Sequence, residues 1–148
     1  MQKCTLALGC FWKPEETFKS KAGIIETEVG YAGGLNERVT YEEVCNGNTG
    51  HAEVVRLTFD ENIISFKKII DLFFKMHDPT QKDMQYPDVG IQYRSEIFYE
   101  TDQQKQEASK ILNEFNKKFD GKIQTNISKI KNYCKAEEYH QKYIEKNK

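Results

Sequence analysis

The sequence predicts an α+β protein, a two-layer sandwich in which helices cover one mixed β-sheet. Short segments with alternating apolar residues, typical of half-buried strands, recur along the chain. Two long segments with apolar residues three and four positions apart, typical of amphipathic helices, lie between them. No linker, repeat or low-complexity stretch divides the 148 residues, so we expect one domain spanning residues 1–148.

The N-terminal third predicts a strand, a helix and a second strand. Residues 3–9 alternate so that Cys4, Leu6 and Leu8 share one face. Pro14 is tolerated only in the first turn of a helix, which predicts a helix from about residue 10 to residue 21. Residues 24–31 resemble a second strand. Glycines and polar residues dominate positions 33–48, where we expect little regular structure.

The middle of the chain predicts a strand, a helix and a long loop. Residues 51–59 form the strand, and Glu53 begins its more apolar row. Ser65 is a suitable N-cap for a helix that ends at Asp78-Pro79 and carries an apolar stripe of Phe66, Ile69, Ile70, Phe73, Phe74 and His77. Residues 80–93 contain Pro87 and Gly90 and predict an ordered loop that is a candidate for function.

The last third predicts two strands around the longest helix. Residues 94–99 form a short strand, and Thr101 with Gln104 forms a capping box at the start of that helix. Asp120-Gly121 ends it. We expect an edge strand over residues 123–130 and a polar terminal helix over residues 136–146. Strands interleaved with two long helices favour a ferredoxin-like core.

Charge and cysteine spacing exclude several functions. The chain has 22 basic and 23 acidic residues and no basic stripe, so we expect no nucleic-acid partner. Its longest mostly apolar stretch, residues 5–12, is far shorter than the about 20 residues that span a membrane. Without a signal-peptide pattern, we expect a cytoplasmic protein with no membrane partner. The cysteines at 4, 10, 45 and 134 match no zinc or C-x-x-C motif, so we expect no metal site and favour a reactive cysteine.

Cys10 lies at the predicted corner between a strand and a helix. A helix N-terminus carries a partial positive charge and free N–H groups, which favour a thiolate. Phe11 and Trp12 follow and provide aromatic surfaces suited to a soft group such as a methyl thioether. The alternative is a cysteine buried in an aromatic corner of the core.

Several oxygen-bearing side chains are candidates to act with this cysteine. A carboxyl desolvated at Glu53 would have a raised pKa and could serve as a general acid, although a glutamate at a strand end is often solvated or salt-bridged. The phenols of Tyr41 and Tyr93 can each donate a hydrogen bond to an oxygen. Asp88 lies in the long loop.

These residues occur within motifs that resemble the A-type peptide methionine sulfoxide reductases over nearly the whole chain. The resemblance rests on separated, collinear segments. They are Gly9-Cys10-Phe11-Trp12, Gly30-Tyr31-Ala32-Gly33-Gly34, Thr40-Tyr41, Thr49-Gly50-His51-Ala52-Glu53, His77-Asp78-Pro79-Thr80-Gln81, Gln92-Tyr93-Arg94-Ser95 and Ala136-Glu137-Glu138-Tyr139-His140-Gln141.

The resemblance implies a reaction and a set of residue roles. The reaction is reduction of the S-epimer of methionine sulfoxide, free or in a protein, with formation of a cysteine sulfenic acid. The implied role is protein repair after oxidative stress. The roles fall on Cys10 as nucleophile, Glu53 as acid, Tyr41 and Tyr93 as oxygen-binding phenols, Asp88 as a buried aspartate, and Phe11 and Trp12 as the methyl-binding pocket.

The sequence also leads to an expectation for how the sulfenic acid is recycled. Many relatives carry a C-terminal tail with resolving cysteines, and we expect this protein to be a form without them, since no cysteine follows Cys134. Cys4 is about 20 Å from Cys10 along an extended strand, whereas a disulfide requires Cα atoms within about 7 Å. Cys45 is interpreted as structural, and Cys134 is an alternative internal partner. We expect a monomer without a cofactor whose sulfenic acid reacts directly with thioredoxin, glutaredoxin or glutathione.

Two other classes of function remain open at this level. A low-pKa cysteine would also react with peroxide, as in a thiol peroxidase. A non-catalytic module could use the aromatic corner to bind an apolar peptide side chain. We interpret His51, His77 and His140 as structural.

Overall fold

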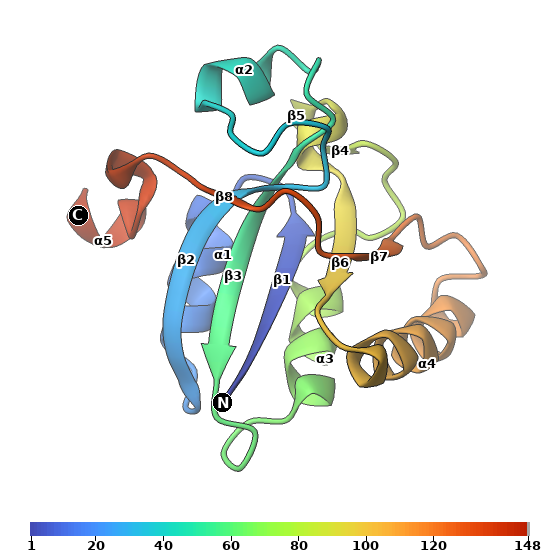
Figure 1. Cartoon of the computed structure of the whole chain (residues 1–148). Coiled ribbons are helices and arrows are strands. Elements are labelled where there is room, and N and C mark those ends of the chain that lie inside the picture. The colour runs from blue at the N-terminus through green and yellow to red at the C-terminus, as the bar shows by residue number, and fades with distance from the viewer. Residues whose placement is uncertain (148) are drawn as a thin grey trace.

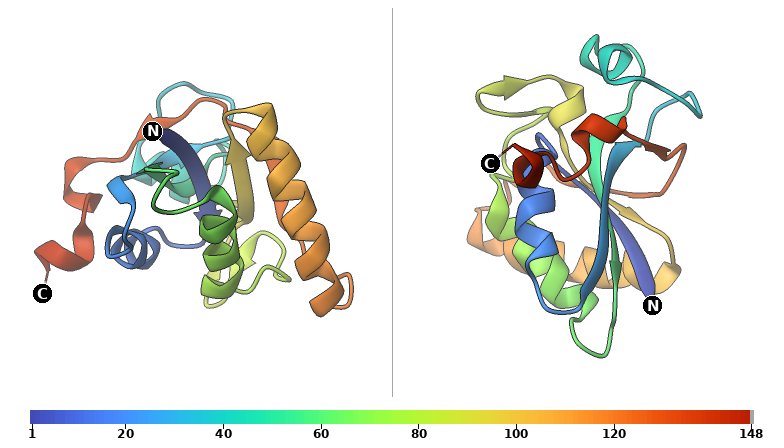
Figure 2. Two further views of the ribbon diagram at one scale, coloured as in Figure 1. Left: turned by 90° about the horizontal axis from the view of Figure 1, so that it is seen from below. Right: turned by 90° about the vertical axis from the view of Figure 1, so that its left-hand side faces the viewer.

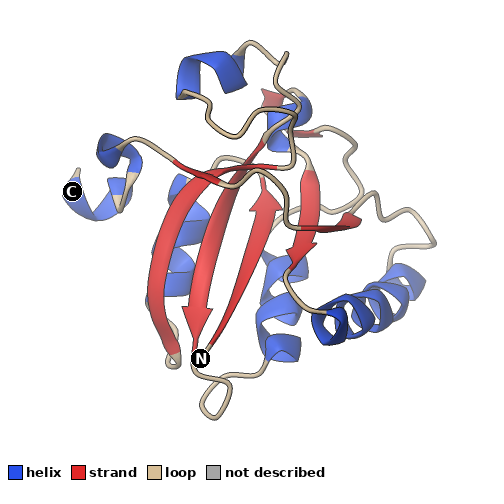
Figure 3. Ribbon diagram, viewed as in Figure 1, coloured by secondary structure: helices blue, strands red, loops and turns tan. Residues whose placement is uncertain are grey.

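The computed structural model describes residues 1–147, which contain a six-stranded mixed sheet covered by helices (Figure 1, Figure 3). The strand order is β7-β6-β1-β3-β2-β8. The strands of this sheet are β1 (Gln2–Leu8), β2 (Ile24–Ala32), β3 (Ala52–Phe59), β6 (Ser95–Tyr99), β7 (Asn126–Lys129) and β8 (Cys134–Lys135). The longer helices are α1 (Trp12–Lys19), α3 (Phe66–Met76) and α4 (Asp102–Lys118). The predicted α+β class is confirmed.

The centre of the sheet has the predicted ferredoxin-like topology. The chain runs β1-α1-β2-β3-α3-β6, and the four strands lie in the order β6-β1-β3-β2. All neighbours among these four are antiparallel, whereas β6 and β7 pair in parallel. Within residues 1–147, no helix is both long enough and apolar enough to cross a lipid bilayer.

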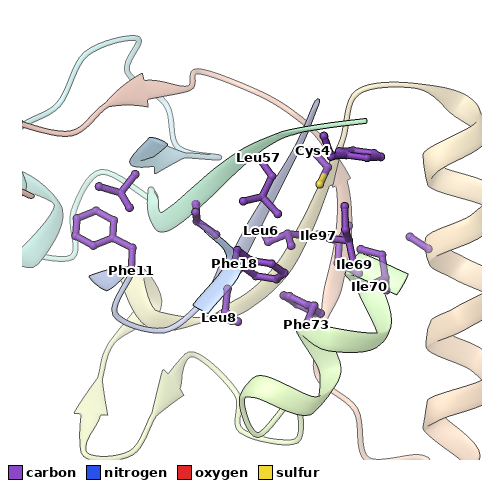
Figure 4. Close-up of a cluster of buried hydrophobic side chains, with 14 of the residues drawn as sticks. Cys4, Leu6, Leu8, Phe11, Phe18, Leu57, Ile69, Ile70, Phe73 and Ile97 are labelled. Carbon is purple, nitrogen blue, oxygen red and sulfur yellow. The ribbon is translucent and has the colours of Figure 1, made fainter. Parts of the chain in front are cut away.

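One face of the sheet carries the large apolar side chains and is covered by α1 and α3 (Figure 2). The predicted row Cys4, Leu6 and Leu8 faces this core, as Figure 4 shows. It packs with Phe18 of α1 and with the predicted stripe of α3, of which Phe73 is fully buried. Ser65 caps α3 as predicted by accepting a hydrogen bond from the Lys68 N–H.

The opposite face carries three buried alanines beside Val54 and Phe98, and another segment of the chain crosses it closely. Five Cα steps from the end of β7 to the start of β8 span at most about 18 Å. The edges of a flat six-stranded sheet are about 24 Å apart. The two edges therefore approach each other at this end, and residues 130–133 cross between them over Ala7, Ala32, Ala52, Val54 and Phe98 (Figure 1).

Two segments predicted as loops contain short regular elements. Residues 33–48 contain α2 (Tyr41–Cys45), which begins with a capping box between Thr40 and Glu43. Residues 80–93 contain the hairpin β4 (Met84–Gln85) with β5 (Asp88–Val89) and the 3₁₀ helix η1 (Ile91–Tyr93). The prediction of little regular structure at 33–48 was wrong at α2, where one S/T-x-x-E motif is enough to start a turn of helix.

The capping box predicted for α4 is only half formed. Thr101 accepts a hydrogen bond from the Gln104 N–H, as predicted. The side-chain oxygen of Gln104 instead accepts a hydrogen bond from the Glu100 N–H. Its side-chain nitrogen donates a hydrogen bond to the backbone carbonyl of Lys3 in β1. The side chain therefore joins the helix start to the sheet.

The prediction of a terminal helix over residues 136–146 was wrong. The segment forms η2 (Glu138–His140) and then α5 (Tyr143–Lys146), separated by Lys142 in the left-handed conformation. The Gln141 side chain bonds the N–H and carbonyl of Val29 in β2, and the Lys142 N–H donates to Glu15. These contacts across the fold replace the backbone bonds that a continuous helix would make.

Candidate active site

Cys10 follows a sharp turn between the end of β1 and the start of α1, as predicted. Gly9 has a φ of +97°, which favours glycine, and a Cβ at this position would lie 3.1 Å from Cγ of Gln85. Cys10 itself is half-buried, so its thiol is neither sealed in the core nor fully exposed.

Two consecutive backbone N–H groups at the start of α1 contact the side chains of Cys10 and Glu53, the predicted nucleophile and acid. The Trp12 N–H bonds the sulfur of Cys10. The Phe11 N–H donates to Oε1 of Glu53 at 3.4 Å. The unpaired donors of a helix N-terminus therefore hold a thiol and a carboxyl next to each other.

The expectation of a thiolate at Cys10 was wrong for the resting protein. Burial raises the pKa of Cys10 to about 11. The Trp12 N–H lowers this pKa, but negative charge on Glu53, Asp88 and Cys45 raises it further. Desolvation therefore outweighs the helix terminus, and the resting thiol is protonated at neutral pH.

Glu53 has the environment that its place on the apolar row predicted. It is 1% exposed, opposite Tyr31 on β2. Burial raises its pKa to about 8; the Phe11 N–H lowers it and Asp88 raises it. Its Oε2 atom is buried without a hydrogen-bond partner among the described residues. The carboxyl is therefore protonated at neutral pH, and one of its oxygens makes no hydrogen bond within the described part of the chain.

Both predicted phenols lie within electrostatic range of Glu53. Tyr93, in η1, has a pKa raised by burial to about 12, with Glu53 and Cys10 among the charges that raise it further. Tyr41 begins α2, and burial likewise raises its pKa, again with a contribution from Glu53. Both hydroxyls therefore remain hydrogen-bond donors near neutral pH.

A cavity of about 660 Å³ opens beside the Cys10 thiol. Its walls come from the β1–α1 corner, from the end of α3 and from the β4–β5 hairpin. They are Leu8, Gly9, Cys10, Lys13, Pro14, Thr17, Lys75, Met76, His77, Gln85, Tyr86, Pro87 and Asp88. Asp88 is therefore at the site, but it is half-buried rather than buried as the resemblance implied, because the hairpin leaves one side open. Among the described residues, no three His, Cys, Asp or Glu side chains are grouped to hold a metal ion.

Comparison with known proteins agrees with the motifs. A family model described as peptide methionine sulfoxide reductase matches residues 2–148. The peptide methionine sulfoxide reductase MsrA of Pelagibacter ubique is 55% identical over 146 residues, which cover 99% of each chain. The chain belongs to the peptide methionine sulfoxide reductase family. It is an oxidoreductase that reduces methionine sulfoxide.

Solved structures of the family share this fold. The reduced form of Mxr1 from Saccharomyces cerevisiae has a TM-score of 0.95 and 40% identity, covering 99% of this chain and 85% of that chain. Mxr1 in complex with Trx2 has a TM-score of 0.69 and 29% identity, covering 96% of this chain and 84% of that chain. A complex between a member of this family and Trx2 is therefore known, which supports an external protein as the reductant.

The aromatic residues of this reductase lie behind the thiol rather than in the walls of the cavity. Phe11 is 1% exposed, with its ring centroid 5.8 Å from that of Tyr31. Trp12 stacks on Tyr143 of α5 at 3.8 Å and donates from Nε1 to His140. A methyl-binding role for Phe11 and Trp12 stays a prediction.

Sequence reasoning missed two contributors to the site. Glu137 accepts from the Tyr41 N–H at 2.9 Å and from the Tyr31 hydroxyl at 2.8 Å, so the C-terminal segment holds α2. Cys45, interpreted as structural, is exposed at the end of α2 and bonds the Tyr41 hydroxyl. The spacing between residues 41 and 45 would have indicated this contact if a helix had been predicted there.

Proposed function

We propose that residues 1–148 form one catalytic domain that reduces the S-epimer of methionine sulfoxide, free or in proteins, at Cys10. The observation that carries the proposal is the pairing of a half-buried thiol with a protonated buried carboxyl, both held by adjacent N–H groups at the start of α1. A sulfoxide has an electron-poor sulfur and a basic oxygen, which match a nucleophile and an acid, respectively.

The chemical step balances without a proton from solvent. Glu53 donates its proton to the sulfoxide oxygen, and the carboxylate then accepts the proton of the Cys10 thiol. The sulfur of Cys10 attacks the sulfur of the substrate and forms a sulfur–sulfur bond. The oxygen then moves to Cys10, and both the sulfur–oxygen bond of the substrate and the new sulfur–sulfur bond break. The products are methionine and a Cys10 sulfenic acid, so the substrate is reduced and the cysteine is oxidised.

The raised pKa of Cys10 fits this sequence of proton transfers. A thiol that is protonated at rest becomes nucleophilic only when a base is formed beside it. Glu53 becomes that base only after a sulfoxide oxygen has taken its proton. The thiolate is therefore generated when substrate is bound, which limits its reaction with other electrophiles such as peroxide.

The phenols and the aromatic residues support recognition of one epimer. Tyr41 and Tyr93 donate hydrogen bonds to the oxygen as it gains negative charge. Phe11 and Trp12 lie next to Cys10 in the chain and are assigned to the methyl group, while the rest of the substrate extends into the 660 Å³ cavity near Asp88. The sulfoxide sulfur carries an oxygen, a methyl group and the rest of the substrate, and each of these three groups is assigned to a different part of the site. In the R-epimer two of them exchange places, so the oxygen no longer faces its hydrogen-bond donors.

Electrons to regenerate Cys10 come from an external thiol: thioredoxin, glutaredoxin or glutathione. The complex of Mxr1 with Trx2 supports thioredoxin as the protein partner. The family match favours this reductase activity over the thiol peroxidase and the non-catalytic binding module.

The test measures methionine formed from each epimer of methionine sulfoxide with dithiothreitol as reductant. We expect turnover of the S-epimer, no turnover of the R-epimer and loss of activity in Cys10→Ser. Hydrogen peroxide serves as a competing substrate and should be consumed much more slowly. Equal rates for the two epimers, or full activity in Cys10→Ser, would contradict the proposal.

A further inference from the structure

A buried histidine lies where several aromatic side chains of the site meet. His140 belongs to η2 and is 1% exposed. Its ring centroid is 4.5 Å from that of Tyr41, 5.2 Å from that of Phe11 and 5.7 Å from that of Trp12. One imidazole from the C-terminal segment therefore contacts a phenol and both aromatic residues that are assigned to the substrate methyl group.

The hydrogen bond of this imidazole defines which of its nitrogens carries the proton. The indole Nε1 of Trp12 can only donate, and it lies 3.1 Å from Nδ1 of His140. Nδ1 is therefore the unprotonated acceptor, and the neutral ring carries its proton on Nε2. Burial lowers the pKa of His140 by more than the negative charge of Glu137 raises it. The ring is therefore neutral near pH 7 and can accept from the indole.

We infer that His140 is a positioning residue, which fixes the Trp12 indole behind Cys10 through the hydrogen bond from Nε1 and so sets the aromatic wall for the substrate methyl group. The inference rests on the proposed function, because that function assigns the methyl group to Phe11 and Trp12. It gives a role in the reaction to a histidine that the sequence indicated only as structural.

The hydrogen bond restricts a movement of the indole that its stacking partner leaves open. Trp12 stacks on Tyr143 at a centroid distance of 3.8 Å and an interplanar angle of 10°. Stacked rings attract each other over a range of offsets, so stacking sets the plane of the indole but not its direction within that plane. A hydrogen bond weakens steeply as its angle departs from linear. Nδ1 of His140 therefore fixes the direction.

The chain on both sides of His140 is anchored, so the acceptor has a fixed place. Glu137 accepts from the Tyr41 N–H at 2.9 Å. Gln141 accepts from the Val29 N–H and donates to the Val29 carbonyl, each at 2.9 Å. These bonds join the C-terminal segment to α2 and to β2, and Figure 2 shows the same segment beside α1. A rigidly held acceptor restricts the indole more than a mobile side chain would.

Packing alone does not explain a histidine at this position. Nε2 of His140 is buried and has no hydrogen-bond partner among the described residues. A buried N–H without a partner lowers stability, and phenylalanine would fill the same place without one. What histidine adds is therefore the acceptor for Trp12.

Two substitutions separate the hydrogen bond from the packing of the ring. His140→Asn places an amide oxygen close to the position of Nδ1, so it keeps an acceptor for the indole but removes the ring. His140→Phe keeps a ring against Tyr41 and removes the acceptor. With dithiothreitol and methionine S-sulfoxide, kcat/KM per folded molecule should fall about 10–100-fold in His140→Phe and stay within about threefold of the wild type in His140→Asn.

The fluorescence of Trp12 provides a readout that does not depend on turnover. Trp12 is the only tryptophan of the chain, so the emission reports the surroundings of this indole. The emission maximum should shift in His140→Phe, where the indole N–H loses its partner, and should change less in His140→Asn. Equal maxima in the wild type and His140→Phe would show that the indole keeps its place without the hydrogen bond, which would overturn the inference.

A double-mutant cycle tests whether His140 acts through Trp12. A Trp12→Phe background has no indole to position, so adding His140→Phe should change kcat/KM by less than about twofold. An undiminished loss in that background would show that His140 affects the reaction independently of Trp12, and the positioning role would be wrong.

Failure of the inference is distinguishable from failure of the proposed function. If the wild type reduces the S-epimer and His140→Phe does so at the same rate, the positioning role is refuted while the proposed function stands. The same holds if His140→Asn loses as much activity as His140→Phe, since the ring and not the acceptor would then be required. If the wild type forms no methionine from the S-epimer, the proposed function itself fails, and the inference fails with it.

Discussion

Two buried glutamates beside α1 show what separates a structural carboxyl from a reactive one. Glu15 and Glu53 are each 1% exposed. Both oxygens of Glu15 are satisfied, by the Thr27 hydroxyl at 2.8 Å and the Lys142 N–H at 2.6 Å. Glu53 has one contact at 3.4 Å, and its other oxygen has no partner within the described part of the chain.

Burial alone therefore does not identify a catalytic acid. A carboxylate that accepts short hydrogen bonds is stabilised in place and joins distant segments, here α1, β2 and the C-terminal region. A carboxyl left with an unused oxygen stays protonated and can bond a ligand. Four experiments test this difference between Glu15 and Glu53.

The largest expected effect is on turnover. Glu53→Gln keeps the shape of the side chain but cannot donate a proton as an acid, so kcat with dithiothreitol and methionine S-sulfoxide should fall about 10²–10⁴-fold. Glu15→Gln, the matched control, should keep kcat within about threefold per folded molecule. Similar losses in both variants would erase the distinction between the two sites.

The next effect concerns the phenols around Glu53. Tyr93→Phe removes one donor to the developing negative charge on oxygen, and kcat for the S-epimer should fall about 100-fold. Tyr99→Phe at the end of β6 is the control and should leave kcat unchanged. An unchanged kcat in Tyr93→Phe would show that Glu53 acts without that phenol.

A third effect separates the two carboxyls by stability. Glu15→Gln weakens two charge-assisted hydrogen bonds and should lower the free energy of unfolding by about 1–3 kcal/mol, measured in urea at pH 7. Glu53→Gln should not lower it, since an amide replaces a neutral acid with few partners. Destabilisation of Glu53→Gln by the larger amount would reverse the comparison.

A further effect is a dependence of stability on pH. The pKa of Glu53 is raised from its ordinary value of 4.5 to about 8, so the folded protein holds a proton that the unfolded chain releases. This contribution to stability is fully present below pH 4.5, is lost as pH rises towards 8 and is then constant. Between pH 5 and pH 8 the urea midpoint of the wild type should therefore fall more than that of Glu53→Gln. Parallel pH profiles would show that Glu53 is ionised in the folded protein.

Local sequence patterns were enough to predict the main secondary structure and most of the candidate residues. Period-two alternation placed Cys4, Leu6 and Leu8 on the core face of β1, and the apolar stripe with its Ser65 cap located α3. These signals are local, since they depend only on spacing within one element. The same alternation put Glu53 on the buried row, which indicated its raised pKa in advance.

Features that depend on contacts between distant segments could not be predicted from these local patterns. Hydrogen bonds from Gln141 to β2 and from Lys142 to Glu15 broke the predicted terminal helix. Desolvation by the assembled fold made Cys10 a protonated thiol against the local preference of a helix N-terminus, and α2 placed Cys45 at the site. Local spacing fixes which face a side chain takes, whereas its solvation and its partners are set by segments far away in the chain.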